Sequence, residues 1–178
     1  MPLIRSLPEN ATLKDLRAAE PDLFTLLQPY GEQLMRGASP LSVGERELIA
    51  AYVSALNACR YCHGTHARVA MEFGVSEDLV DALVADFDAA PVDADLKPIL
   101  RYVGKLTLTP SKMVDADAQA VYEAGWEDTA LIHAVAVCAY FNNMNRLVEG
   151  SGIVGDASAH AAGARLLVDE GYLRSRGA

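Results

Sequence analysis

The placement of its prolines is the feature that most constrains the fold of this chain. All eight prolines lie either at or before position 40 or between positions 91 and 110, which leaves 41–90 and 111–178 free of helix breakers. Ala and Leu, which lose little free energy on entering a helix, outnumber the β-branched residues Val, Ile and Thr. No segment alternates apolar and polar residues with the period of two that a half-buried strand requires. We therefore expect an all-α fold.

Capping residues and apolar spacing predict where the helices begin and end. Ser42 and Glu45 form a capping box, in which each side chain satisfies an unpaired backbone amide near the other. Asn57 is the expected N-cap of the next helix, which ends at Gly74. We also expect helices after Asn10 or Thr12, after Pro21, after Ser76, and over about 94–106, 115–124, 127–147 and 156–171.

The composition is that of one soluble globular domain spanning 1–178. Hydrophobic residues make up 51% of the chain and charged residues 22%, unlike a disordered protein. The net charge of −9 gives no cationic footprint for nucleic acid. No N-terminal apolar run is long enough for a signal peptide, and the longest apolar stretch, 130–141, falls short of the ~18 residues that span a membrane. We expect a cytoplasmic protein with no nucleic-acid or membrane partner.

A weak internal sequence similarity suggests a division of the chain into two halves. The first, about 1–90, contains the Cys and His motif described below, and the second, about 91–178, would be a degenerate copy. Leu48–Ala51 and Leu131–Ala134 share the pattern Leu-Ile-x-Ala. Few identities extend this match, and Ala-rich amphipathic helices align readily by chance. Two degenerate helical repeats and a chance likeness both remain open.

One segment, 45–66, concentrates the residues that carry chemistry. Cys59, Cys62, His63 and His66 lie close together within it. Thiols three positions apart on a helix have Cα atoms about 5 Å apart, within the range that a disulfide accepts. Both thiols are expected at a helix start, where unpaired amides and the helix dipole stabilise a thiolate. Cys62 and His66 are four positions apart and share a face, so His66 could take a proton from Cys62.

Glu47 is the less obvious member of this group. If the chain reverses near Asn57, Glu47 lies about 15 Å and His66 about 12 Å from the turn along their helices. The two side chains are then nearly level across a helical hairpin. We therefore expect Glu47 to orient His66 and to support its charge, as in the nucleophile–base–orienter arrangement of activated cysteines.

Four other interpretations of this segment compete with a redox-active dithiol. Cys59–His63 matches the string that attaches c-type haem, but such chains are normally exported. A zinc site usually recruits a second segment to complete its tetrahedron, whereas these two Cys and two His lie on one helix. A thioredoxin-type motif needs a βαβ context that is not expected here. The plainest alternative is small residues packing two helices. We expect no metal and no cofactor.

The separations of Glu47, Cys59, Cys62 and His66 resemble those of the alkylhydroperoxidase D-like family, within the carboxymuconolactone decarboxylase-like superfamily. The segment that carries this diagnostic pattern covers about residues 40–75. The later phrase YFNNMNRLVEG and the order of helices also resemble the branch known as peroxidase-related enzymes. The likeness therefore spans most of the chain.

The resemblance implies a helical bundle, commonly assembled as trimers or hexamers, that reduces peroxides with thiols. It implies that Cys62 is the peroxidatic thiol, that Cys59 resolves it, and that Glu47 and His66 form a proton relay. The chain departs from the family pattern at Tyr61, where a His is usual. His63 follows Cys62 in the sequence instead of preceding it, and is not an evident replacement for that His. Carboxymuconolactone decarboxylases lack the Cys pair, which argues against decarboxylation.

Other conspicuous residues have structural interpretations. Cys138 lies in an apolar run and is expected to be a small buried residue; three Cys, an odd number, argue against a disulfide framework. His133 is expected in the core or at an interface, and Trp126 as a packing anchor at a helix start. Asn142, Asn143 and Asn145 are expected to be amides that pack helices together.

The leading hypothesis is a peroxidase that reduces organic hydroperoxides or hydrogen peroxide through a Cys59–Cys62 disulfide. Its partners would be a dithiol reductant of the dihydrolipoamide or thioredoxin type and further copies of the chain, because many short amphipathic helices leave more apolar surface than one bundle covers. The alternative is a non-enzymatic thiol redox or metal-binding module that acts through a protein partner.

Overall fold

The computed structural model describes residues 1–173, and these residues form helices joined by turns and loops, with no strand among them. The expected all-α fold is confirmed. In chain order the elements are α1 (Leu13–Ala19), α2 (Pro21–Phe24), α3 (Leu27–Arg36), α4 (Val43–Leu56), α5 (Arg60–Glu72), α6 (Leu79–Ala85), α7 (Leu96–Leu108), the 3-10 turn η1 (Pro110–Lys112), α8 (Asp115–Glu123), α9 (Asp128–Ser151) and α10 (Ala157–Asp169).

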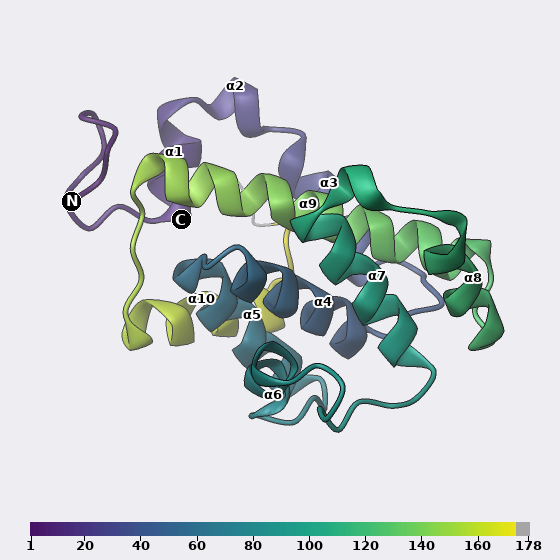
Figure 1. Ribbon diagram of the computed structural model, residues 1–178. Coiled ribbons are helices and arrows are strands. Elements are labelled where there is room, and N and C mark those ends of the chain that lie inside the picture. The colour runs from purple at the N-terminus through teal and green to yellow at the C-terminus, as the bar shows by residue number, and fades with distance from the viewer. Residues whose placement is uncertain (174–178) are drawn as a thin grey trace.

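The helices are arranged around α4 and α9. Figure 1 shows the long helix α9 lying across the molecule, with α1 and α2 on one side of it and α4, α5 and α6 on the other. α4 packs against α5, α6, α7 and α9. It is therefore covered on nearly all sides, and every residue from Gly44 to Ser54 except Glu45 is buried. A functional group placed on α4 lies in the interior of the bundle.

Most helix ends lie close to their predicted positions. The capping box forms: Ser42 Oγ accepts from Glu45 N at 3.2 Å, and Glu45 Oε2 accepts from Ser42 N at 2.6 Å. The helix expected after Pro21 is instead two short helices, α2 and α3. Pro29 explains the break, because it has no N–H to bond the carbonyl of Thr25 and is tolerated only in the first turn of a helix.

The prediction that Asn57 caps α5 is wrong. Asn57 ends α4, Ala58 adopts a left-handed conformation with φ 55°, and Cys59 is the residue at the N-cap of α5. The amide of Cys59 donates to Ser54 O at 2.9 Å, which holds the turn tightly against the end of α4. The side chain of Asn57 points to α9, where its Nδ2 donates to Asn145 Oδ1 at 2.9 Å.

Amides of α9 join it to α4 as expected. Asn145 Nδ2 donates to Ser54 Oγ at 3.0 Å, and Asn142 Nδ2 donates to Thr107 Oγ1 on α7 at 3.2 Å. Asn143 differs from expectation because it faces outward. Buried polar groups that satisfy one another in this way fix the register of the helices that they join.

The remaining structural expectations concern single side chains. Cys138 is fully buried and lies 3.3 Å from Thr107 Oγ1, as a small interior residue. His133 is half-buried on α9. Trp126 precedes α9 and its Nε1 donates to Asp95 O at 2.7 Å, so it anchors the start of that helix to the start of α7. Within residues 1–173 no helix is long and apolar enough to cross a bilayer.

α10 approaches α5 closely because glycines lie on both sides of their contact. A Cβ on Gly64 would overlap the ring of His160, and one on Gly163 would meet Thr65 Cγ2 at 3.3 Å. The His160 ring has little room to retreat, since Tyr61 packs edge-on against it with ring centroids 6.3 Å apart. The close approach lets α10 form one wall of the cavity described below.

This packing predicts a measurable asymmetry between two glycines. Gly64→Ala should lower the free energy of unfolding by about 1–3 kcal/mol, because the added methyl overpacks the α5–α10 contact. Gly150→Ala, within α9 and facing open space, should raise it by about 0.5–1 kcal/mol. Urea unfolding of both variants checks this. Equal stabilisation by the two substitutions would contradict the close approach of α10.

Candidate active site

The structure brings Glu47 of α4 and His66 of α5 together inside the bundle. Glu47 Oε2 lies 2.7 Å from His66 Nδ1 across the α4–α5 hairpin, at the level that the helix rise predicts. Glu47 is fully buried, and His66 is nearly so. The ring of Phe141 on α9 packs edge-on against His66 with centroids 4.5 Å apart, which holds the imidazole in place.

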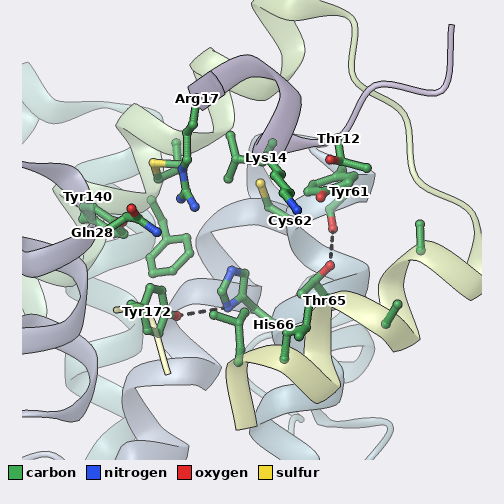
Figure 2. Close-up of a pocket in the computed structure, with 18 residues that line it drawn as sticks. Thr12, Lys14, Arg17, Gln28, Tyr61, Cys62, Thr65, His66, Tyr140 and Tyr172 are labelled. Atoms are coloured by element: carbon green, nitrogen blue, oxygen red, sulfur yellow. Dashed lines mark hydrogen bonds between the residues drawn. The ribbon is translucent and has the colours of Figure 1, made fainter. Parts of the chain in front are cut away.

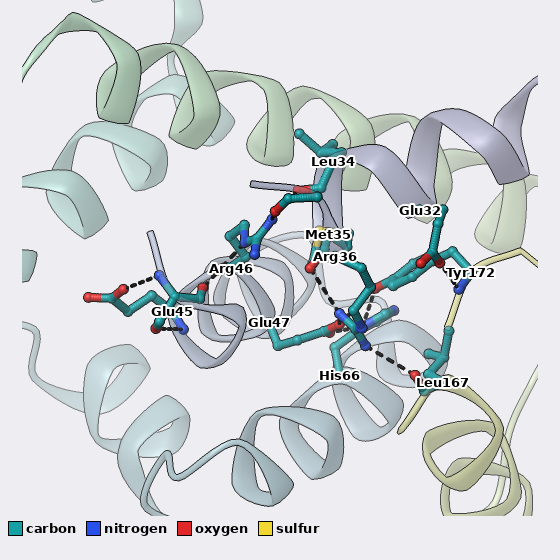
Figure 3. Close-up of polar contacts among 12 residues, drawn as sticks. Glu32, Leu34, Met35, Arg36, Glu45, Arg46, Glu47, His66, Leu167 and Tyr172 are labelled. Atoms are coloured by element: carbon teal, nitrogen blue, oxygen red, sulfur yellow. Dashed lines mark hydrogen bonds and ion pairs between the residues drawn. The ribbon is translucent and has the colours of Figure 1, made fainter. Parts of the chain in front are cut away.

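Two further side chains contact the Glu47 carboxylate. Arg36 Nη1, from the end of α3, donates to Oε1 at 2.7 Å, and the hydroxyl of Tyr172 donates to the same oxygen at 3.0 Å (Figure 3). Arg36 Nη2 also donates to Leu167 O on α10 at 3.1 Å. The carboxylate therefore joins α3, α4, α5 and the segment after α10. Sequence analysis missed both Arg36 and Tyr172, since neither lies near the motif in the chain.

The electrostatics of this cluster favour an ionised carboxylate. Burial alone would raise the pKa of Glu47, but the charge and hydrogen bond of His66, followed by those of Arg36, hold the pKa below its ordinary value of 4.5. An ionised carboxylate only accepts hydrogen bonds, so His66 Nδ1 must carry the proton that it shares with Glu47. The other nitrogen, Nε2, is then the basic position of the neutral ring, and Figure 2 shows it pointing into a cavity on the side of Cys62.

That cavity has a volume of about 230 Å³ and lies between α1, α5, α9 and α10 (Figure 2). Its wall is mostly apolar, and both Cys62 and His66 contribute to it. The residues that line it are Thr12, Leu13, Lys14, Arg17, Gln28, Tyr61, Cys62, Thr65, His66, Tyr140, Phe141, Met144, Ala159, Ala162, Gly163, Leu166, Leu167 and Tyr172.

The two thiols of the motif differ in access. Both are free. Cys62, in the first turn of α5, is 5% exposed and lines the cavity, whereas Cys59 at the N-cap is wholly buried and does not. A hydrogen bond to Cys62 and then burial raise the pKa of Cys59, and a further hydrogen bond to Glu149 acts in the same direction. At neutral pH Cys59 is therefore a protonated thiol. Of the two thiols, only Cys62 lines the cavity.

His63 is not part of this group. Its Nε2 lies 3.8 Å from Asp81 Oδ1 and its Nδ1 lies 3.4 Å from Ala51 O, and His63 does not line the cavity. Tyr61, which stands where the family pattern has a His, lines the cavity instead. Among residues 1–173 no three His, Cys, Asp or Glu side chains are grouped so that they could hold a metal ion.

Comparisons with known proteins agree with the all-helical fold. The model of the carboxymuconolactone decarboxylase family matches residues 21–93. A solved peroxidase-related protein from Silicibacter sp. TM1040 is 27% identical to this chain. The match covers 82% of this chain and 76% of that protein, with a TM-score of 0.75. A second, described as an alkylhydroperoxidase AhpD core from Ralstonia eutropha JMP134, is 25% identical, with coverages of 84% and 79% and a TM-score of 0.76. Part of the chain therefore matches the carboxymuconolactone decarboxylase family, and the chain is similar in fold to peroxidase-related, AhpD-like proteins.

Other members of this fold carry other activities. A debrominase solved with 2,3,4-tribromopyrrole is 16% identical to this chain, over 83% of this chain and 78% of its own, with a TM-score of 0.69. At that identity the likeness is one of fold alone. No curated protein matches the sequence significantly.

The lowered pKa of Glu47 predicts how the stability of this protein depends on pH. A carboxyl whose pKa is lower in the folded state stabilises the fold above pH 4.5, and this contribution is lost as pH falls through the folded value. In urea unfolding, the stability advantage of the wild type over Glu47→Gln should be constant above pH 4.5 and should shrink below it.

The matched control is Glu77→Gln, which removes an exposed carboxylate outside the cluster. Its difference from the wild type should be small at every pH. A Glu47→Gln difference as flat as that of the control would show that Glu47 is not held ionised by its partners.

Proposed function

We propose that this chain is a thiol-dependent peroxidase that reduces organic hydroperoxides or hydrogen peroxide, with Cys62 as the attacking thiol. One observation carries the proposal. Cys62 and His66 line the same cavity one helical turn apart, and His66 rests on a buried carboxylate that fixes its tautomer. A nucleophile, a base and an orienting group in this order are the parts that an activated cysteine requires.

In the first step His66 Nε2 accepts the proton of Cys62, and the thiolate attacks the terminal oxygen of the peroxide. The S–O bond forms as the O–O bond breaks, so Cys62 is oxidised to a sulfenic acid and the peroxide is reduced to an alcohol or to water. The imidazolium returns its proton to the departing oxygen. Glu47 stabilises the imidazolium through the 2.7 Å contact with Nδ1.

In the second step Cys59 condenses with the sulfenic acid. Its sulfur displaces hydroxide from Cys62, the disulfide forms, and one water leaves after proton transfer. The raised pKa of Cys59 keeps it protonated and unreactive until Cys62 is oxidised. The two-residue spacing between the cysteines places them one helical turn apart, within the span of a disulfide. A dithiol of the dihydrolipoamide or thioredoxin type would then reduce the disulfide and return both thiols.

The assembly and location of the protein remain predictions. We expect a homo-oligomer, trimeric or hexameric, and the exposed apolar side chains of Leu23, Leu26 and Ile132 support an interface between copies. We expect it to act in the cytoplasm. Because a debrominase shares the fold, the peroxide substrate is the element of the proposal that most needs a direct test.

Turnover and chemical trapping test the roles of the two thiols. The wild type should consume a hydroperoxide repeatedly when supplied with dihydrolipoamide or thioredoxin, and Cys62→Ser should not. In Cys59→Ser the sulfenic acid should accumulate on Cys62 after one turnover, where a dimedone-type probe adds to it. Mass spectrometry of the tryptic peptide 61–68 locates the adduct.

Two results would contradict this assignment. A probe-reactive Cys59 in the Cys62→Ser variant, with Cys59→Ser inert, would exchange the two roles. A wild-type protein that reacts with peroxide only once, with every dithiol tried, would favour a non-enzymatic redox module that acts through a protein partner.

The proton relay predicts non-additive kinetics. Glu47→Gln and His66→Gln should each lower kcat/KM for the hydroperoxide by ~100-fold or more, because each disables the same base. The double variant should lose little more than the worse single variant, since the two groups act as one unit. Steady-state kinetics on folded variants measure this, and losses that multiply in full would indicate that Glu47 and His66 act separately.

A further inference from the structure

Two cationic side chains line the cavity next to Cys62, although the chain as a whole is acidic. The net charge is −9, yet no Asp or Glu is among the described residues that line the cavity. Two cations do line it, Lys14 and Arg17, both on α1. They are three positions apart and therefore share one face of that helix. Figure 2 shows both side chains extending from α1 into the cavity, on either side of Cys62 in that view.

Asp15, the acidic residue that lies between these two cations in sequence, does not line the cavity. Asp15 Oδ2 accepts from Thr12 N and from Thr12 Oγ1, each at 2.7 Å, as part of the cap of α1. Its carboxylate is therefore engaged within its own helix and does not line the cavity. The amide of Gln28, which does line it, adds a neutral hydrogen-bonding group to the wall (Figure 2).

The rest of the wall is apolar and the volume is small. Leu13, Phe141, Met144, Leu166 and Leu167 line the cavity together with two alanines. Its 230 Å³ falls just below the ~300–1,000 Å³ of sites for drug-sized ligands. A wall of this kind suits a single short hydrocarbon body, and the two cations suit an anionic group on that body. Arg in particular binds carboxylates through two parallel hydrogen bonds.

We propose that the cavity selects hydroperoxides that carry a carboxylate on a medium-length apolar chain, and that Lys14 and Arg17 bind that carboxylate. The inference rests on the proposed peroxidase function and names its substrate class. The hydroperoxide group reaches Cys62, which takes the terminal oxygen and becomes a sulfenic acid, while the substrate leaves as the corresponding hydroxy acid. The carboxylate takes no part in the oxygen transfer and serves to position the molecule.

A matched pair of substrates tests the proposal. A medium-chain ω-hydroperoxy carboxylic acid and its methyl ester differ only in the charge of the head group. The wild type should prefer the acid by about tenfold or more in kcat/KM, since hydrogen bonds to charged groups contribute this much when partly shielded from water. The preference should fall as salt is added. In the double variant Lys14→Gln/Arg17→Gln it should fall toward one.

Two control variants separate charge from structure. Arg5→Gln/Lys112→Gln removes the same two charges from exposed positions outside the cavity and should keep the preference for the acid. Lys14→Arg/Arg17→Lys keeps both charges on α1 and should also keep the preference for the acid. Loss of the preference for the acid in Arg5→Gln/Lys112→Gln would show that overall charge, and not the cavity, selects the acid.

A binding measurement separates this inference from the peroxidase function. Octanoate should slow the alkylation of Cys62 by iodoacetamide, read on peptide 61–68, and octanol should protect less. The protection by octanoate should be lost in Lys14→Gln/Arg17→Gln. If neither hydroperoxide is turned over but octanoate still protects, the anion site stands and the peroxidase proposal fails. If acid and ester are turned over equally and octanoate protects no better than octanol, the peroxidase stands and this inference is wrong.

Discussion

The buried carboxylate of Glu47 is the interaction on which the rest of the site depends. A fully buried charge is costly unless hydrogen-bonded partners surround it. Here His66, Arg36 and Tyr172 supply them, at 2.7 Å, 2.7 Å and 3.0 Å. These partners come from three separate parts of the chain, so the carboxylate can be satisfied only when α3, α5 and the segment after α10 are all in place. Removing one partner of such a group typically costs ~3–5 kcal/mol.

Helix geometry gives the two thiols different surroundings. Cys59 lies at the N-cap, beneath the turn that the left-handed Ala58 creates, and Cys62 lies one turn further along, at the cavity wall. Dipole reasoning alone favours the thiol nearer the helix start. Burial and the hydrogen bond to Cys62 work against that preference by raising the pKa of Cys59. The cavity wall and the nearby His66 therefore support the proposal that Cys62 is the attacking thiol, as the positioned base already indicated from the sequence.

The sequence predicts the parts of this site that are local in the chain and misses those that are not. The capping box at Ser42 fixes the start of α4, and the rise per residue then sets Glu47 level with His66, so their contact follows from spacing alone. Arg36 and Tyr172 could not be found in this way, because tertiary packing and not helical periodicity brings them to Glu47. Asn57 was misassigned for a related reason: its capping propensity lost to a hydrogen bond with α9, which is distant in sequence.

The charge of the cavity illustrates why net charge alone does not define what an acidic protein binds. At physiological salt the field of an exposed charge decays over ~8 Å, so most of the acidic surface is screened from an occupant of the cavity. Lys14 and Arg17 line the wall itself, and Arg17 is half-buried there, where screening is weaker than at the open surface. The hydrogen bonds from Thr12 to Asp15 matter here because they engage the carboxylate that lies between Lys14 and Arg17 in the sequence of α1. The local arrangement of one short helix can thus set a preference opposite in sign to that of the whole molecule.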